Sequence, residues 1–184
     1  MSKKRVCVYG IGGVGGYLGG MLAVGAKDNY EVYFVARGNH LEEIKKNGLA
    51  LITPSKGGIR IHPTRAVENV GDLPEMDIII LAVKGYDLVE AVEDINKITK
   101  ENTTIIAPLN GVDIHERIRS KLNRGIVLPS CIFVTSTVKE PGVVVHKGGT
   151  SLLVLGKDPQ VEDYDSKELV EIINNAEIPH RWEE

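Results

Sequence analysis

The chain has 184 residues, 42% of them hydrophobic, and a formal net charge of -3. This length fits one domain with a core, and without a basic excess we expect no nucleic-acid partner. The five histidines are scattered, and Cys7 and Cys131 lack a paired metal-ligand spacing, so we expect no metal site. Both cysteines are expected to be buried thiols of a cytoplasmic protein.

Residues 5–9, RVCVY, form a short β-branched run before a glycine, which predicts a buried strand. Gly10, Gly12 and Gly15 then form a G-x-G-x-x-G pattern. In dinucleotide-binding folds the first glycine permits a tight turn, the second admits a pyrophosphate, and the third lets the helix pack against the sheet. A helix N-terminus also presents free N–H groups to phosphates. This stretch therefore predicts a strand–turn–helix unit that binds a dinucleotide.

Glycine fills seven of the eleven positions 10–20, although each glycine inside a helix costs about 1 kcal/mol relative to alanine. Gly15, Gly19 and Ala23 recur at helical spacing, so we expect the helix to lie close to its neighbours. A signal peptide or membrane helix is the alternative, because basic residues precede the uncharged segment 6–26. Eight of those 21 residues are glycine, which makes the segment too weakly hydrophobic, and we expect no membrane association.

Residues 31–36, EVYFVA, predict the second strand, which leads into Arg37. Domains that bind NAD usually carry an acidic residue near this strand end for the ribose 2′-hydroxyl, whereas an arginine suits the 2′-phosphate of NADP. In the sequence no acidic residue follows until Glu42. A guanidinium can pair bidentately with phosphate, so Arg37 predicts NADP. A solvated surface arginine is the alternative.

The rest of the chain alternates between strand and helix patterns, as doubly wound α/β domains do. We expect Asp87 and Asp113, each followed three residues later by a glutamate, to cap two of the helices. Residues 157–166 are expected to form a loose loop. The expected elements are a helix at 40–47, a hairpin at 49–65, a strand at 77–83, a helix from 88, a strand at 103–107, a helix at 114–122, strands within 126–138, 143–146 and 151–155, and a helix at 167–176. The expected fold is an α/β, doubly wound, Rossmann-type sheet, mostly parallel, with helices on both faces and extra antiparallel strands toward the C-terminal end.

Two polar residues follow predicted parallel strands at their carboxyl ends, where ligands bind in such sheets. Lys84 follows strand 77–83, and Asn110 follows strand 103–107 within APLNGVD. Hydride delivery to a ketone develops negative charge on the oxygen, which a cation or hydrogen-bond donor must stabilise. We therefore expect both residues on the nicotinamide side of the crevice, although neither is an obvious proton donor. The alternatives are an exposed strand-end lysine and an Asn-Gly turn.

Five motifs, in order along the chain, together resemble the 2-dehydropantoate 2-reductase (ketopantoate reductase) family. They are VYGIGGVGGYLGG, VARGNHLEEIKKNGL, LAVKGYD, PLNGVD and PGVVVHKGG. The resemblance implies NADPH-dependent reduction of 2-dehydropantoate, a 2-keto acid, to (R)-pantoate on the route to pantothenate and coenzyme A. It also implies that Arg37 binds the 2′-phosphate and that Lys84 and Asn110 are catalytic and contact the nicotinamide and substrate. The implied pyrophosphate loop consists of Gly10, Ile11, Gly12, Gly13, Val14 and Gly15.

The chain departs from this family in two places. Asp87 stands where the family often has glutamine, three residues after Lys84. Family members also continue beyond the position of Glu184 into a helical domain that supplies a proton-donating lysine. We expect residues 1–184 to be the NADP-binding domain, either of a truncated enzyme or of a genuine one-domain protein. A stand-alone dinucleotide-binding module and another dehydrogenase of the same fold are the alternatives, and a homodimer is left open.

Overall fold

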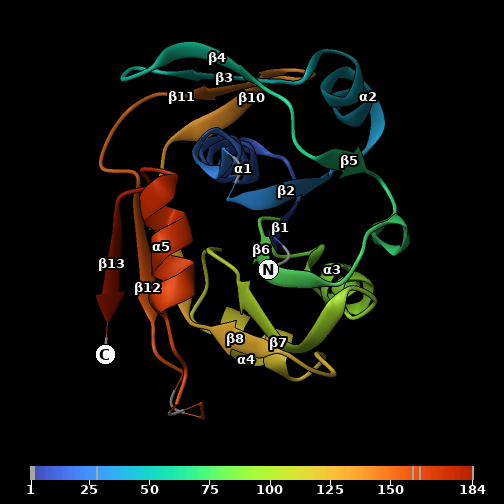
Figure 1. Cartoon of the computed structure of the whole chain (residues 1–184), viewed down its shortest axis with the longest axis vertical. Helices are drawn as coiled ribbons and strands as arrows, with labels where there is room; N and C mark the ends of the chain where they lie inside the picture. Colours follow the sequence, from blue (N-terminus) through green and yellow to red (C-terminus); the bar gives the residue numbers. More distant parts are fainter. Residues whose placement is uncertain (1–2, 28, 159, 162, 184) are drawn as a thin grey trace.

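A six-stranded parallel sheet forms the centre of the protein in a computed structural model that describes residues 3–27, 29–158, 160–161 and 163–183 (Figure 1). Numbered within this sheet alone, the strands lie in the order 3-2-1-4-5-6, which is that of the Rossmann dinucleotide-binding fold. All five pairings are parallel. In spatial order the strands are β5 (Arg65–Val67), β2 (Tyr30–Val35), β1 (Lys4–Tyr9), β6 (Met76–Leu81), β7 (Thr99–Ile106) and β8 (Ile126–Leu128).

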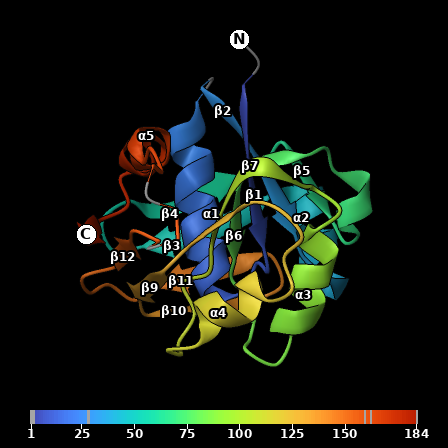
Figure 2. The same cartoon turned by 90° about the horizontal axis from the view of Figure 1, so that it is seen from below.

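Helices cover both faces of this sheet because its apolar side chains alternate between two buried clusters. Along β1, Val6 and Val8 pack on one face, whereas Cys7 packs on the other. Figure 2 shows a helix on either side of the β1 and β6 ribbons. The first face carries α1 (Gly13–Ala26) and α5 (Lys167–Asn175), and the second carries α3 (Leu88–Ile95) and α4 (Ile114–Arg119). The expected doubly wound architecture is confirmed.

The extra strands form two smaller sheets that contain parallel as well as antiparallel pairs. One sheet lies over α1, on the side away from β2 (Figure 1), and joins β3 to β11 in parallel although they are far apart in the sequence. The other joins β12 in parallel to a strand that we did not expect, β13. Their orders are β10 (Ser136–Glu140), β11 (Val143–His146), β3 (Leu49–Thr53), β4 (Gly57–Ile61), and β13 (His180–Glu183), β12 (Leu152–Gly156), β9 (Ser130–Phe133).

The glycines of α1 are explained by its position between the main sheet and the β3–β11 sheet. A Cβ at Gly15 would collide with the carbonyl oxygen of Gly10, and one at Gly19 would lie 2.8 Å from Phe34 Cε1. On the opposite side, a Cβ at Gly16 would lie 2.5 Å from Val144 Cγ2. The predicted close packing is confirmed. A second glycine stripe, Gly16 and Gly20, which face Val144 and Leu51 of the added sheet, was not predicted.

Several local expectations were wrong. Asp87 and Asp113 precede α3 and α4, but neither side chain makes a capping hydrogen bond. Residue 65 begins β5 of the main sheet, where the sequence predicted the end of the hairpin. Cys7 is buried as expected, but Cys131 is only partly buried. The two remaining short elements are α2 (Gly38–Asn47), close to its expected bounds, and the 3-10 turn η1 (Val70–Asp72).

The segment expected to be a loose loop, 157–166, is anchored at its start. Asp158 is fully buried and forms an ion pair with Arg119 of α4, and His115 Nε2 lies 3.7 Å from the same carboxylate. A buried charge needs such partners, so this end of the segment is fixed. Residues 159 and 162 lie outside the described part. Among the described residues, no helix is long and apolar enough to span a membrane.

Candidate dinucleotide site

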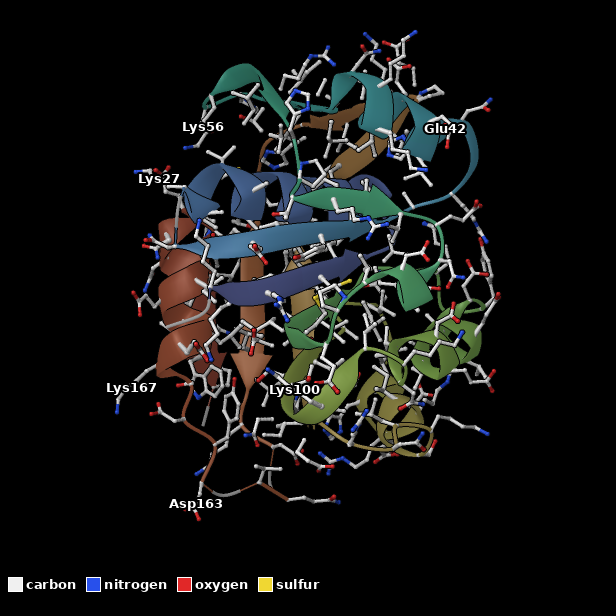
Figure 3. The ribbon with its side chains drawn as sticks, turned by 45° about the vertical axis from the view of Figure 1, so that its right-hand side comes forward. Lys27, Glu42, Lys56, Lys100, Asp163 and Lys167 are labelled. Atoms are coloured by element: carbon white, nitrogen blue, oxygen red, sulfur yellow. The ribbon has the colours of Figure 1, made fainter. Side chains whose placement is uncertain are left out.

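A cleft of about 560 Å³ opens where β1, β2 and β6 end. Figure 3 shows the β1 and β2 arrows side by side and pointing the same way, so their carboxyl ends meet at one edge of the sheet. The chain order reverses between β1 and β6, and ligands of open α/β sheets bind at such a switch point. The cleft is lined by Tyr9, Gly10, Ile11, Gly12, Val35, Ala36, Arg37, His40, Glu68, Ala82, Val83, Lys84, Asp87, Glu90, Ala91, Asp94 and Val138.

The loop after β1 has the geometry that the glycine pattern predicts. Gly10 has φ +95°, a conformation that side chains rarely adopt, and its N–H donates to the Val35 carbonyl at 2.9 Å. A Cβ at Gly10 would lie 2.9 Å from the Ala82 carbonyl oxygen. Gly12 lines the cleft, and a Cβ there would meet no described atom within 4 Å. The loop therefore makes a tight turn and leaves open space beside Gly12.

The N-terminus of α1 follows directly. Gly12 is its N-cap and has no side chain, so no side-chain oxygen accepts from the first N–H groups of this helix. Such N–H groups bind phosphate oxygens well. Gly13, Val14 and Gly15 form the first turn and do not line the cleft. A Cβ at Gly13 would overlap the Ser136 carbonyl of β10, so this glycine allows the second sheet to pack closely.

Arg37 follows β2, as predicted, and its side chain is 78% exposed. It immediately precedes α2, which begins two residues earlier than expected. An acidic residue nevertheless lies beside Arg37. The Nη2 atom of Arg37 is 3.4 Å from Oδ2 of Asp87, which lies on the segment between β6 and α3. The sequence places no carboxylate near Arg37 before Glu42, but the fold brings in Asp87 from 50 positions away.

Lys84 lines the cleft after β6 and is exposed. Within the part of the chain that the structure describes, its ammonium forms no ion pair. Asn110 is also exposed, on the loop after β7, but it is not among the residues that line the cleft. The structure thus brings Lys84 to the same cleft as the glycine loop and Arg37, and leaves Asn110 outside it.

Tyr9 and Asp94 form a hydrogen-bonded pair on the cleft wall that the sequence analysis missed. The Tyr9 hydroxyl donates to Asp94 Oδ2 at 2.8 Å, and Lys97 Nζ lies 2.7 Å from Oδ1. Burial and this hydrogen bond raise the pKa of Tyr9. For Asp94, burial acts to raise the pKa, but the hydrogen bonds from Lys97 and Tyr9 outweigh it and lower the value. Asp94 is therefore charged and already paired at neutral pH.

His40 is a second cleft residue that no sequence signal pointed out, because a lone histidine in a helical pattern has no distinctive neighbours. Its Nδ1 accepts from the N–H of Gly142 at 2.9 Å, which ties α2 to the turn between β10 and β11. Nδ1 must be unprotonated to accept this bond. Burial lowers the pKa of His40, so the neutral ring is favoured.

A smaller cleft of about 330 Å³ lies elsewhere, beside α1 and the end of β11. It contains a buried polar pair in which Ser151 Oγ lies 2.7 Å from His146 Nε2. The Tyr17 ring packs on His146 with the ring centroids 4.6 Å apart. This cleft lies away from the carboxyl ends of the six-stranded parallel sheet and from the N-terminus of α1, which is where a Rossmann fold binds its dinucleotide.

Comparisons with known proteins show to which proteins the chain is similar. The sequence model of the family described as "Ketopantoate reductase PanE/ApbA" matches residues 6–160. The uncharacterized oxidoreductase YkpB of Bacillus subtilis is 31% identical over 153 residues, covering 83% of this chain and 48% of that protein. A 2-dehydropantoate 2-reductase of Mesorhizobium japonicum is 34% identical over 108 residues, covering 59% of this chain and 32% of that protein.

The fold matches a solved structure as well. The crystal structure of 2-dehydropantoate 2-reductase from Porphyromonas gingivalis W83 superposes with a TM-score of 0.90 at 34% identity, covering 99% of this chain and 64% of that one. The chain spans about half the length of the Bacillus relative.

Proposed function

The chain belongs to the ketopantoate reductase PanE/ApbA family of nicotinamide-dependent oxidoreductases, and we propose that it is the cofactor-binding part of an NADPH-dependent 2-dehydropantoate 2-reductase. The reaction would reduce 2-dehydropantoate to (R)-pantoate. We place it in the cytoplasm, where the free thiols Cys7 and Cys131 would remain reduced. The observation that carries the proposal is the open space at Gly12, at the switch point of a Rossmann sheet.

The residues that line the cleft fit a dinucleotide. The first N–H groups of α1 would bind the pyrophosphate, and the missing side chain of Gly12 leaves the room that it needs. The Arg37 guanidinium is exposed at the end of β2, where it can reach a phosphate on the adenosine ribose. A reduced nicotinamide bound here would supply the hydride for the ketone.

Lys84 is the residue of the cleft suited to the substrate side. Lys84 lies three residues after β6, and no ion pair within the described residues occupies its ammonium. We assign it the stabilisation of the negative charge that develops on the ketone oxygen. Asn110, on the next loop of the sheet, would donate a hydrogen bond to the same ligand. The Bacillus relative extends beyond the part that matches this chain. We propose that the proton donor comes from an additional region such as that one.

The test is an assay of NADPH oxidation with 2-dehydropantoate and with a panel of other 2-keto acids, using the full open reading frame. We expect 2-dehydropantoate to have the highest kcat/KM and Lys84→Ala to lower it by more than about tenfold, mainly through kcat. Gly85→Ala, the next residue, is the matched control, because a Cβ there meets open space. A clear preference for another 2-keto acid would contradict the substrate, and full activity of Lys84→Ala would contradict the role of the lysine.

A further inference from the structure

We propose that Asp87 is a specificity-determining residue that competes with the 2′-phosphate of NADPH for Arg37 and thereby reduces the preference for NADPH over NADH. The proposal rests on the proposed function only in taking the main cleft as a dinucleotide site. In this proposal Asp87 disfavours binding of the 2′-phosphate, whereas Arg37 favours it.

The contact between the two side chains is the first observation. Arg37 Nη2 lies 3.4 Å from Asp87 Oδ2, with the arginine side chain 78% exposed and the aspartate 27% exposed. In the described residues, Asp87 is the sole carboxylate paired with Arg37. A phosphate that binds Arg37 must therefore share the guanidinium with Asp87 or displace it.

The backbone of Asp87 is fixed, so this carboxylate remains near the guanidinium. The Asp87 N–H donates to the Lys84 carbonyl at 2.9 Å, and the Asp87 carbonyl accepts from Ala91 N–H at 3.0 Å. The side chain makes no capping hydrogen bond to α3 and so is free to face the cleft. Because aspartate is short, it cannot move far from this wall, whereas the long Arg37 side chain can change partners.

The balance of charges around the cleft also disfavours a 2′-phosphate. Four carboxylates line it, from Glu68, Asp87, Glu90 and Asp94, against the two cations Arg37 and Lys84. Asp94 is paired with Tyr9 and Lys97, and Asp87 is paired with Arg37 itself. Glu68 and Glu90 form no ion pair with Arg37 in the described residues and add only a weaker negative potential that salt screens. A 2′-phosphate carries close to two negative charges, whereas a ribose 2′-hydroxyl is neutral and can donate to a carboxylate. The wall that weakens NADPH binding can therefore accept the ribose of NADH.

The test compares the affinities of NADPH and NADH for the wild type and for Asp87→Asn, by fluorescence titration at low and high salt. Asparagine keeps the size of the side chain and removes its charge. We expect NADPH to bind about tenfold more tightly and NADH to change by less than about twofold, with the gain shrinking at high salt. Asp87→Gln, which also removes the charge, is the second variant and should act in the same direction.

Glu90→Gln is the matched control, since Glu90 lines the same cleft but, among the described residues, forms no ion pair with Arg37. It should change the NADPH-to-NADH ratio by less than about twofold. In an Arg37→Ala background, Asp87→Asn should have a smaller effect than in the wild type, because the competition for the guanidinium is gone. An unchanged ratio in Asp87→Asn and Asp87→Gln would overturn the proposal, as would an equal gain from Glu90→Gln. Absence of binding of both nucleotides to the wild type would instead overturn the dinucleotide site itself, and this proposal with it.

Discussion

The two sides of the cleft differ in how their residues are brought together. The loop 10–15 is one continuous segment, and most of its glycines are explained by open space, by the loop itself or by Ala82 just after β6, whereas Gly13 meets Ser136 of β10. The opposite wall joins Arg37 and Asp87, which are 50 positions apart and meet only because β2 and β6 flank β1. We propose that the loop determines whether a dinucleotide binds, and that the wall determines which dinucleotide is preferred. Breaking each side separately should give different results.

The largest expected effect is on the loop. Gly12→Val should weaken NADPH and NADH binding by more than about a hundredfold, because the branched side chain would fill the space beside the first N–H groups of α1. The melting temperature should change little, since no described atom lies near that position. Equal binding by the variant and the wild type in a titration would show that the pyrophosphate lies elsewhere.

Breaking the wall should have a smaller and selective effect. Arg37→Ala should lower the affinity for NADPH by about ten- to a hundredfold, because a charge-assisted contact contributes roughly 1.5–3 kcal/mol. NADH should be affected much less, since it lacks the 2′-phosphate. Parallel titrations with the two nucleotides measure this. Similar losses for both would mean that Arg37 supports the fold of the cleft and does not read the phosphate.

The helix behind the loop should respond in stability. Gly19→Leu should lower the free energy of unfolding by about 1–3 kcal/mol, because its Cβ would already lie 2.8 Å from Phe34 Cε1 and the longer side chain would push α1 off the sheet. Gly85→Ala serves again as the control with open space around the added methyl group. Denaturant unfolding of both variants measures the loss of stability. Equal unfolding midpoints for Gly19→Leu and the wild type would refute the close packing of α1.

The smallest expected effect concerns pH. Burial lowers the pKa of His40 in the folded protein, so the unfolded chain binds more protons in the range below the ordinary histidine value of about 6.5. Stability should therefore fall as the pH drops below that value toward the folded pKa. His115 and His146, whose pKa values burial also lowers, act in the same direction. Melting curves between pH 5 and 8 should show a shallower slope for His40→Asn than for the wild type, and an identical slope would exclude His40 as a contributor.

The sequence predicted those features that depend on neighbouring residues. The strand–turn–helix at residues 5–26, the open position at Gly12 and the exposed Arg37 at the end of β2 follow from local patterns, and the structure confirms their placement. The parallel pairing of β3 with β11 could not be predicted, because the pattern of each strand says nothing about a partner nearly a hundred positions away. For the same reason, the sequence alone could not explain why α1 carries a second glycine stripe.

The positions of the candidate-site residues could likewise be predicted only in part. Lys84 and Asn110 were both predicted from their positions after parallel strands. Lys84, three residues after β6, lines the cleft, whereas Asn110, four residues after β7, does not. Asp87 was interpreted as a helix cap from its spacing to Glu90, and its side chain faces Arg37 instead. A capping pattern can predict where a helix begins without predicting the partner of the carboxylate. The Asp87 carboxylate pairs with the Arg37 guanidinium, which is a stronger hydrogen-bond partner than a backbone N–H of α3.

The central claim is that the cleft at the ends of β1, β2 and β6 is the dinucleotide site. The most direct measurement is an NADPH titration of the isotopically labelled 20.1 kDa chain, followed residue by residue in amide NMR spectra. We predict saturable binding in the micromolar range or weaker, about -8 kcal/mol at best, with the largest shifts at Gly10, Gly12, Arg37 and Lys84. Shifts gathered instead around Ser151 in the smaller cleft, or no shifts at millimolar NADPH, would contradict the account.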